Sequence, residues 1–303
     1  MKYSTTECLE RLESIRLSGE RRSQEVVEIG EILERSNTIP KTDEGWMILE
    51  QIAIGGMDTG KFELANACIQ KLKQMFSQSK RVRMLECMYL EANGWYNEAL
   101  DEYNKSLELD PTDMNIPKRK IAILIAQNDI SSAIKALLQH VDNFPNDLES
   151  WIKLSQLYLD EHLYPQAAYC IEELILMNPV NHFYHLKYAE IQYTLGNIEM
   201  ALKYYLSVVE LSRDNVQGFY GVKLCSDRLM QNISSSKKTL DSARGLKNKN
   251  TLSELSQLAT ERLLFAYSNP SATSEKLIYK DDKDIEEKPT PMTKLVLESW
   301  LKL

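Results

Sequence analysis

The 303-residue chain has no long hydrophobic run and no excess of basic charge. Its longest purely aliphatic stretch, Ile121 to Ala126, is far shorter than the roughly 20 residues of a membrane-spanning helix. The segment Met1 to Glu10 has no apolar run of the kind that a signal peptide needs. A net charge of -8 argues against nucleic acid as the main partner. We therefore expect a cytoplasmic protein that neither spans a membrane nor binds nucleic acid.

Cysteine is also scarce, and the five cysteines are widely spaced. An odd number without clustering argues against a disulfide framework or a Cys-based metal site. This distribution favours buried thiols in a reducing compartment. The five residues are Cys8, Cys68, Cys87, Cys170 and Cys225.

What the chain does have is a period of 34 residues. The alanines at this spacing are Ala65, Ala99, Ala133, Ala167 and Ala201. The prolines are Pro111, Pro145 and Pro179. A third series, each member five residues before its alanine, is Gly60, Gly94, Asn128, His162 and Gly196. A period of this length indicates helical hairpins stacked one on the next.

Each series has a mechanical reason. A small alanine lets the two helices of a hairpin approach closely, whereas a larger side chain would strain the packing. Gly or Asn favours the left-handed backbone that ends a first helix, and His tolerates it. Proline ends a second helix, because it lacks an amide donor and restricts the residue before it.

The unit from Leu148 to Asn181 resembles the tetratricopeptide repeat most clearly. The residues that fill the family's positions in order are Trp151, Leu154, Ser155, Tyr158, Ala167, Ile171, Leu174 and Pro179. This resemblance implies an all-α fold, a right-handed superhelix of helical hairpins that forms an α-solenoid. We expect capping helices at both ends, since a terminal repeat otherwise exposes an apolar face.

The period divides the chain into segments. Residues 1–45 are expected to hold two capping helices, Thr5 to Leu17 and Ser23 to Arg35. Residues 46–215 hold five repeats, and residues 216–267 form a last helical unit with a flexible insertion at 231–250. A charged linker spans 268–291, and a short amphipathic helix spans 292–303.

Signals for catalysis are weak. Gly55 to Phe62 has the glycines and lysine of a phosphate-binding loop, but Phe62 stands where a magnesium-binding Ser or Thr is needed. This stretch coincides with a repeat hinge, so we interpret it as structural. His182 and His185 could share a metal, yet no third ligand is placed beside them, and packing or capping is favoured. Glu172 and Glu173 fit a solvated helix face. We expect no enzyme activity, no cofactor and no metal site.

A concave surface lined by the first helix of each repeat is the candidate site. In the tetratricopeptide family, ligands contact fixed positions of these helices. Here the selected positions are Met47, Glu50, Ile54, Met57, Arg81, Met84, Met88, Glu91, Lys118, Ile152, Gln156, Phe183, Glu190 and Tyr193. Methionine surfaces adapt to apolar segments, which favours an extended or helical peptide as ligand. The alternative for any one of these apolar side chains is packing against an adjacent helix.

One known use of the fold is disfavoured. Chaperone-binding arrays hold a terminal carboxylate with Lys and Asn at set positions, where this chain has mostly Glu, Met, Ile or Leu. We therefore do not expect a carboxylate clamp.

The stretch Glu149 to Gly196 also resembles a narrower family, the second subunits of the endoplasmic reticulum membrane protein complex. The telling residues are Glu161, His162, Tyr164, Ala167, Ala168, Cys170, Glu172, Glu173, Leu174, Asn178, Pro179, Asn181, His182 and Tyr184. Further matches are Glu25 to Glu31 and Lys118 to Ile123, so the resemblance spans most of Ser23 to Tyr220.

The resemblance implies a non-catalytic scaffold subunit at the cytosolic face of the endoplasmic reticulum membrane. Its implied partners are cytosolic segments of membrane-embedded subunits and a small soluble subunit, within a complex that inserts tail-anchored and multipass proteins. The alternative is a tetratricopeptide-repeat adaptor that binds soluble partners or chaperone peptides.

Overall fold

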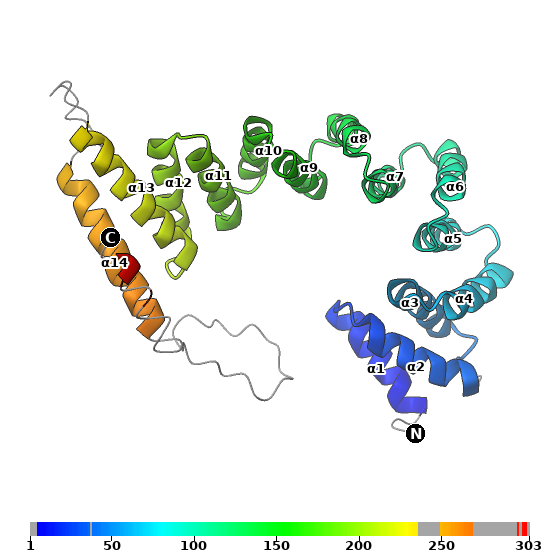
Figure 1. Ribbon diagram of the computed structural model, residues 1–303. Helices are drawn as coiled ribbons and strands as arrows, with labels where there is room; N and C mark the ends of the chain where they lie inside the picture. Colours follow the sequence, from blue (N-terminus) through cyan, green and yellow to red (C-terminus); the bar gives the residue numbers. More distant parts are fainter. Residues whose placement is uncertain (1–4, 37, 236–248, 269–295, 297–298, 302–303) are drawn as a thin grey trace. The chain divides into compact units, whose positions relative to one another are not determined.

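The computed structural model describes residues 5–36, 38–235, 249–268, 296 and 299–301 (Figure 1). Every regular element within these ranges is an α-helix. The chain divides into two compact units, residues 1–136 (unit 1) and 137–303 (unit 2). None of the helices in the described ranges is both long and apolar enough to cross a bilayer.

The helices follow the predicted period. Unit 1 contains α1 (Thr5–Ser18), α2 (Ser23–Ser36), α3 (Asp43–Thr59), α4 (Phe62–Met75), α5 (Lys80–Ala92), α6 (Tyr96–Leu109) and α7 (Asn115–Ala126). The division between the units falls within α8 (Ile130–Asn143). Unit 2 continues with α9 (Leu148–Asp160), α10 (Tyr164–Met177), α11 (His182–Thr194), α12 (Ile198–Leu211), α13 (Val216–Ser235) and α14 (Lys249–Ser268). This confirms the prediction of a tetratricopeptide-like array of helical hairpins.

The hinge of every repeat has the left-handed backbone that its residue type indicates. The φ angles are 75° at Gly60, 80° at Gly94, 62° at Asn128, 58° at His162 and 85° at Gly196. At each hinge the following residue donates its amide to the carbonyl five residues earlier, at 2.8 to 3.0 Å. This bond satisfies a carbonyl that the helix end would leave without a donor. The hinge therefore ends each first helix at a fixed residue.

The alanine series lies in the core. All five alanines are 0 % exposed, as expected where the helices of a hairpin approach most closely. The prolines follow second helices: α6, α8 and α10 each end two residues before Pro111, Pro145 or Pro179. Trp151 adds a bond between repeats, because its indole Nε1 donates to the carbonyl oxygen of Pro145 at 2.8 Å.

Helices α1 and α2 cover the first repeat. Leu12 and Leu33 share one buried cluster with Ile48 and Ile52 of α3. Helix α3 begins after Thr42, whose hydroxyl accepts the amide of Gly45 at 3.4 Å. These contacts fit the capping role that the sequence predicts, because they bury the apolar face of the first hairpin.

The C-terminal segments differ in part from expectation. Helix α13 continues to Ser235 and α14 begins at Lys249, so both ends of the predicted 231–250 insertion are helical. Residues 236–248 and 269–291 lie outside the described residues. Of the predicted helix 292–303, the structure describes 296 and 299–301, where the Trp300 ring lies 5.4 Å from the Tyr220 ring. The division into repeat, linker and tail segments stays a prediction.

Candidate partner-binding site in unit 1

The first helices of three successive repeats line one hollow in unit 1. It has a volume of about 260 Å³, and we call it the repeat hollow. Residues of α3, α5 and α7 form most of its wall, with Arg21 and Tyr96 at its edge. Its lining is Arg21, Ile54, Met57, Asp58, Met88, Glu91, Ala92, Tyr96, Arg119, Ala122, Ile123 and Ala126. The structure thus brings together four of the predicted residues, Ile54, Met57, Met88 and Glu91.

A second hollow of about 260 Å³ shares Ile54, Asp58 and Arg21 with the first. We call it the cap hollow, because α1, the α1–α2 turn and α2 form one of its walls. Its lining is Ile15, Arg16, Glu20, Arg21, Arg22, Ser23, Val26, Met47, Glu50, Gln51, Ile54, Gly55, Asp58 and Arg81. Three more predicted residues, Met47, Glu50 and Arg81, lie here.

Two forked ion pairs stand at the edges of these hollows. Arg21 donates from Nε and Nη2 to the two oxygens of Asp58, at 2.8 and 2.6 Å. Arg81 meets Glu50 in the same way, with Nε to Oε1 and Nη2 to Oε2 both at 2.7 Å. Such forks fix the direction of both side chains. The hydrogen bond from Arg21 holds the pKa of the Asp58 carboxyl below its usual range.

A third pair lies deeper. Arg119 Nη1 donates to Glu91 Oε2 at 3.4 Å, and its Nη2 lies 3.4 Å from the sulfur of Met88. Burial raises the pKa of the Glu91 carboxyl, because the charged form loses water that Arg119 only partly replaces. The repeat hollow therefore combines an apolar wall with a carboxylate that prefers a nearby cation or proton donor.

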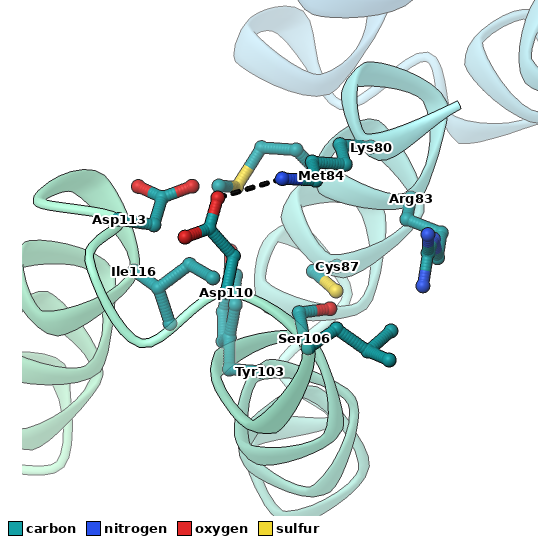
Figure 2. A pocket seen from close by; sticks show the side chains of 10 residues that line it. Lys80, Arg83, Met84, Cys87, Tyr103, Ser106, Asp110, Asp113 and Ile116 are labelled. Atoms are coloured by element: carbon teal, nitrogen blue, oxygen red, sulfur yellow. Dashed lines mark hydrogen bonds and ion pairs between the residues drawn. The ribbon is translucent and has the colours of Figure 1, made fainter. Parts of the chain in front are cut away.

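Two predicted residues of unit 1 lie outside both hollows. Met84 lines a separate space of about 30 Å³ between α5, α6 and the turn to α7. Figure 2 shows this space, with the Lys80–Asp110 ion pair at 2.6 Å beside Met84. Lys118 on α7 is half-buried, and the next residue, Arg119, lines the repeat hollow instead.

The predicted residues of unit 2 lie on α9 and α11. Ile152 and Gln156 lie on α9, half-buried and exposed respectively. On α11, Phe183 is 60 % exposed and Glu190 accepts a bond from Lys187 at 2.8 Å. Tyr193 packs under the guanidinium of Arg228, which lies 5.2 Å from its ring centre. The assignment of all fourteen residues to partner binding stays a prediction.

Sequence reasoning selected only Arg81 among the arginines that line the two hollows. Arg16 lies on α1, and Arg21 and Arg22 lie in the α1–α2 turn, a region to which the repeat pattern assigns no ligand positions. Arg119 stands one position after the selected Lys118. A signal was present, because arginine is enriched at protein interfaces, but the repeat pattern does not use it.

The weak sequence signals for a phosphate-binding loop and for a metal site have structural explanations. Gly55 and Gly56 lie inside α3, where a Cβ atom would stand 3.1 Å from Val26 and from Ala65 respectively. They allow close helix packing and do not form a phosphate-binding loop. His185 Nε2 donates to the carbonyl oxygen of Pro179 at 2.8 Å, which caps the turn before α11. No group of three His, Cys, Asp or Glu suited to a metal occurs in the described part of the chain.

Comparisons with known proteins give a family match and several related sequences. The family described as EMC2 TPR-like repeat domain matches residues 69–202. The ER membrane protein complex subunit 2-A of Xenopus laevis is 38% identical over 221 residues, which are 72% of this chain and 74% of that protein. The TPR repeat protein oca3 of Schizosaccharomyces pombe is 31% identical over 194 residues, 62% of this chain and 69% of that one.

A solved structure supports the fold alone. The C-terminal part of a TPR repeat-containing protein from Cytophaga hutchinsonii aligns with a TM-score of 0.54 at 13% sequence identity. The alignment covers 85% of this chain and 94% of that one.

Proposed function

Because this chain belongs to the family of ER membrane protein complex subunit 2, we propose that it serves as a non-catalytic scaffold of that complex. In this role it holds cytosolic segments of membrane-embedded subunits, together with a small soluble subunit, at the cytosolic face of the endoplasmic reticulum. It thereby supports the insertion of tail-anchored and multipass proteins into the membrane. The path that the inserted proteins follow lies in other subunits.

The repeat hollow carries this proposal. Its wall offers Met57 and Met88, which adapt to apolar side chains of different shape. Its edge offers the Arg21–Asp58 pair, whose arginine side chain is 73% exposed, and exposed pairs of this kind contribute only about 0–1 kcal/mol. A polar group of a partner can therefore exchange with this pair at little cost. This combination suits a polypeptide segment better than a small-molecule substrate.

Holding a segment in place has a thermodynamic cost. Ordering a flexible tail costs about 0.5–1.5 kcal/mol for each immobilised side chain, and buried contacts must offset this cost. Each buried apolar anchor contributes about 1.5–3 kcal/mol of transfer free energy before that cost. A few anchors spread over successive hollows are therefore needed for stable assembly.

Purification of the tagged full chain in mild detergent tests the proposal. We expect membrane-embedded subunits of the complex to be recovered with it. Recovery of soluble chaperones alone would favour the adaptor alternative and reject the scaffold.

A variant links recovery to the hollow. Ala122 is exposed on the wall of the repeat hollow, and Ala122→Glu fills that space with a charge while keeping a good helix former. We expect it to reduce recovery of the membrane subunits. The control, Gln74→Glu, adds a carboxylate to the exposed side of α4 and should leave recovery unchanged. Equal recovery with both variants would show that the hollow does not bind the partner.

A further inference from the structure

Helix α13 repeats the register of α3, five repeats of 34 residues later. The residues of α3 that line the cap hollow include Glu50, Ile54 and Asp58. The residues at the same positions of α13 are Tyr220, Leu224 and Arg228. The buried side is repeated as well, because Ile52 and Val222 share a position and are 0 % and 2 % exposed. The side of α13 that carries Tyr220, Leu224 and Arg228 therefore matches the lining of the hollows, and we call it the α13 groove face.

Neighbouring helices orient the side chains of the α13 groove face. The hydroxyl of Tyr220 donates to the hydroxyl of Tyr267 on α14 at 3.3 Å, which holds the Tyr220 ring. The guanidinium of Arg228 lies 5.2 Å from the ring centre of Tyr193 on α11. Leu224 lies one helical turn from both Tyr220 and Arg228, and 42 % of its surface is exposed. The face thus presents a held aromatic ring beside an open aliphatic side chain.

The chain itself covers one end of the α13 groove face. The Trp300 ring (red in Figure 1) lies 5.4 Å from the Tyr220 ring at an interplanar angle of 59°, an arrangement that aromatic pairs favour. Only 36 % of Trp300 is exposed. The next residue, Leu301, is half-buried and packs against the buried cluster that α11, α12, α13 and α14 share. A segment far from α13 in the sequence therefore anchors two apolar side chains on this helix pair.

We propose that Trp300 and Leu301 act as an internal ligand of the α13 groove face and give way there to an apolar segment of a partner subunit. Their contacts are apolar, and apolar contacts are non-directional, so an aromatic side chain of another polypeptide can replace the Trp300 ring. Leu224 stays open beside the covered Tyr220, so a partner segment that reaches both buries more apolar surface than the internal ligand does. This inference rests on the proposed scaffold function and adds a means of regulating it.

The covalent link to the rest of the chain sets how strongly a partner must bind. A ligand in the same chain competes at an effective concentration that its tether fixes. A partner segment displaces it only when its own affinity or local concentration is higher. A segment with an aromatic and an aliphatic residue side by side, as in Trp300 and Leu301, and a further apolar anchor for Leu224 meets this condition, because each additional buried anchor increases its affinity.

A synthetic peptide with the sequence of residues 292–303 tests whether the internal ligand occupies a site. The peptide is labelled with a fluorophore, and its affinity for the full chain is measured by fluorescence anisotropy with and without Trp300→Ala. We expect about tenfold tighter binding to the Trp300→Ala chain, because its internal competitor is weakened. The control, Trp95→Ala, removes an indole that is 51 % exposed in unit 1 and should leave the affinity unchanged. Equal affinities for the altered and unaltered chains, or no binding to the Trp300→Ala chain, overturn the internal ligand.

A matched pair of substitutions tests where the peptide binds. In the Trp300→Ala chain, Leu224→Glu places a charge on the α13 groove face, and we expect about tenfold weaker binding of the peptide because the charge would be buried against apolar side chains. The control is Met200→Glu on α12, where the methionine is 43 % exposed, close to the 42 % of Leu224. This control should leave the affinity unchanged. Weakening by both substitutions, or by neither, overturns the assignment to the α13 groove face.

Photo-crosslinking tests whether the internal ligand gives way on assembly. The full chain carries a benzophenone amino acid at position 224, and the purified chain is compared with the complex recovered from cells in mild detergent. In the purified chain we expect crosslinks to residues 292–303 of the same molecule. In the complex we expect crosslinks to a co-purifying subunit at an apolar residue. The same crosslinker at position 200 is the control and should give neither product.

The outcomes separate the two proposals. Failure to recover the complex counts against the proposed function. A recovered complex in which position 224 still crosslinks only to residues 292–303, or in which position 200 gives the same products, overturns the exchange and leaves the scaffold role standing. A purified chain without crosslinks to residues 292–303 overturns the internal ligand.

Discussion

The ring of Tyr205 in α12 lies directly on Gly221 in α13, and no Cβ atom fits between them. Tyr205 is 7 % exposed within the core of unit 2, so its ring has little freedom to move aside. We expect Gly221→Ala to lower the free energy of unfolding by about 1–3 kcal/mol through overpacking. This loss exceeds the roughly 1 kcal/mol that alanine gains over glycine in a helix. Urea denaturation measures the change.

A second background isolates the cause. In a Tyr205→Leu chain the ring is absent, and Gly221→Ala should then be neutral or stabilising. An equal loss in both backgrounds would contradict the steric explanation.

The two hinges without glycine predict a gain in stability. Asn128 and His162 are exposed and adopt φ of 62° and 58°. A left-handed backbone costs most L-residues about 1–2 kcal/mol, whereas glycine adopts it freely. We therefore expect His162→Gly to raise the melting temperature and His162→Val to lower it. Differential scanning calorimetry checks both.

A helical position supplies the control for the hinges. Asn104 is exposed within α6 and accepts a bond from Lys120 Nζ at 2.9 Å. Asn104→Gly should lower the melting temperature through the usual penalty of glycine in a helix and through the loss of this bond. A rise at Asn104, or a fall for His162→Gly, would show that backbone conformation does not set the effect.

Acid should loosen the contact between the α1–α2 turn and α3. Because Arg21 lowers the pKa of Asp58 in the folded chain, this carboxylate stabilises the fold fully above the unfolded value of about 3.9. The contribution is lost as pH falls through the folded pKa. We expect Asp58→Asn to be destabilising at pH 7 and nearly neutral at pH 2. Thermal denaturation at both values measures this difference.

The pH dependence of the Asp58→Asn effect should require Arg21. In an Arg21→Gln background, the effect of Asp58→Asn should vary much less with pH. A difference that is independent of pH in the unaltered background would show that the ion pair does not stabilise the fold.

The thiols should be unreactive in the folded chain. All five cysteines are free and buried. Burial raises the pKa of Cys68, Cys87, Cys170 and Cys225 to about 12, so few thiolates form at pH 8. We expect slow labelling by a chromogenic disulfide reagent in buffer and rapid labelling of five thiols in urea. Rapid labelling in buffer would indicate that the helices open easily.

Much of the fold could be predicted, because each helical hairpin needs the same residue types at the same positions, and these positions recur every 34 residues. The hinge series and the alanine series mark where each first helix ends and where its partner packs. The end of α13 was missed, since Gln231 to Ser235 lacks the apolar spacing that indicates a helix. That stretch is held by continuity with the helix before it.

The site was harder to predict than the fold. Ile54, Met57, Met88 and Glu91 fall on one hollow because repeat position fixes their direction. Met84 does not, since the turn between α6 and α7 adds a separate space beside it. The arginines of the α1–α2 turn reach the hollow only through tertiary packing, which repeat spacing does not encode.

The α1–α2 turn supplies Arg21 and the start of α2 supplies Ser23, and both side chains donate to Asp58 of α3. A product that starts at an internal methionine such as Met47 would lack this wall entirely, while its later repeats kept their own hinges. Such a shortened form would retain partners held by the later repeats and lose those that depend on the first.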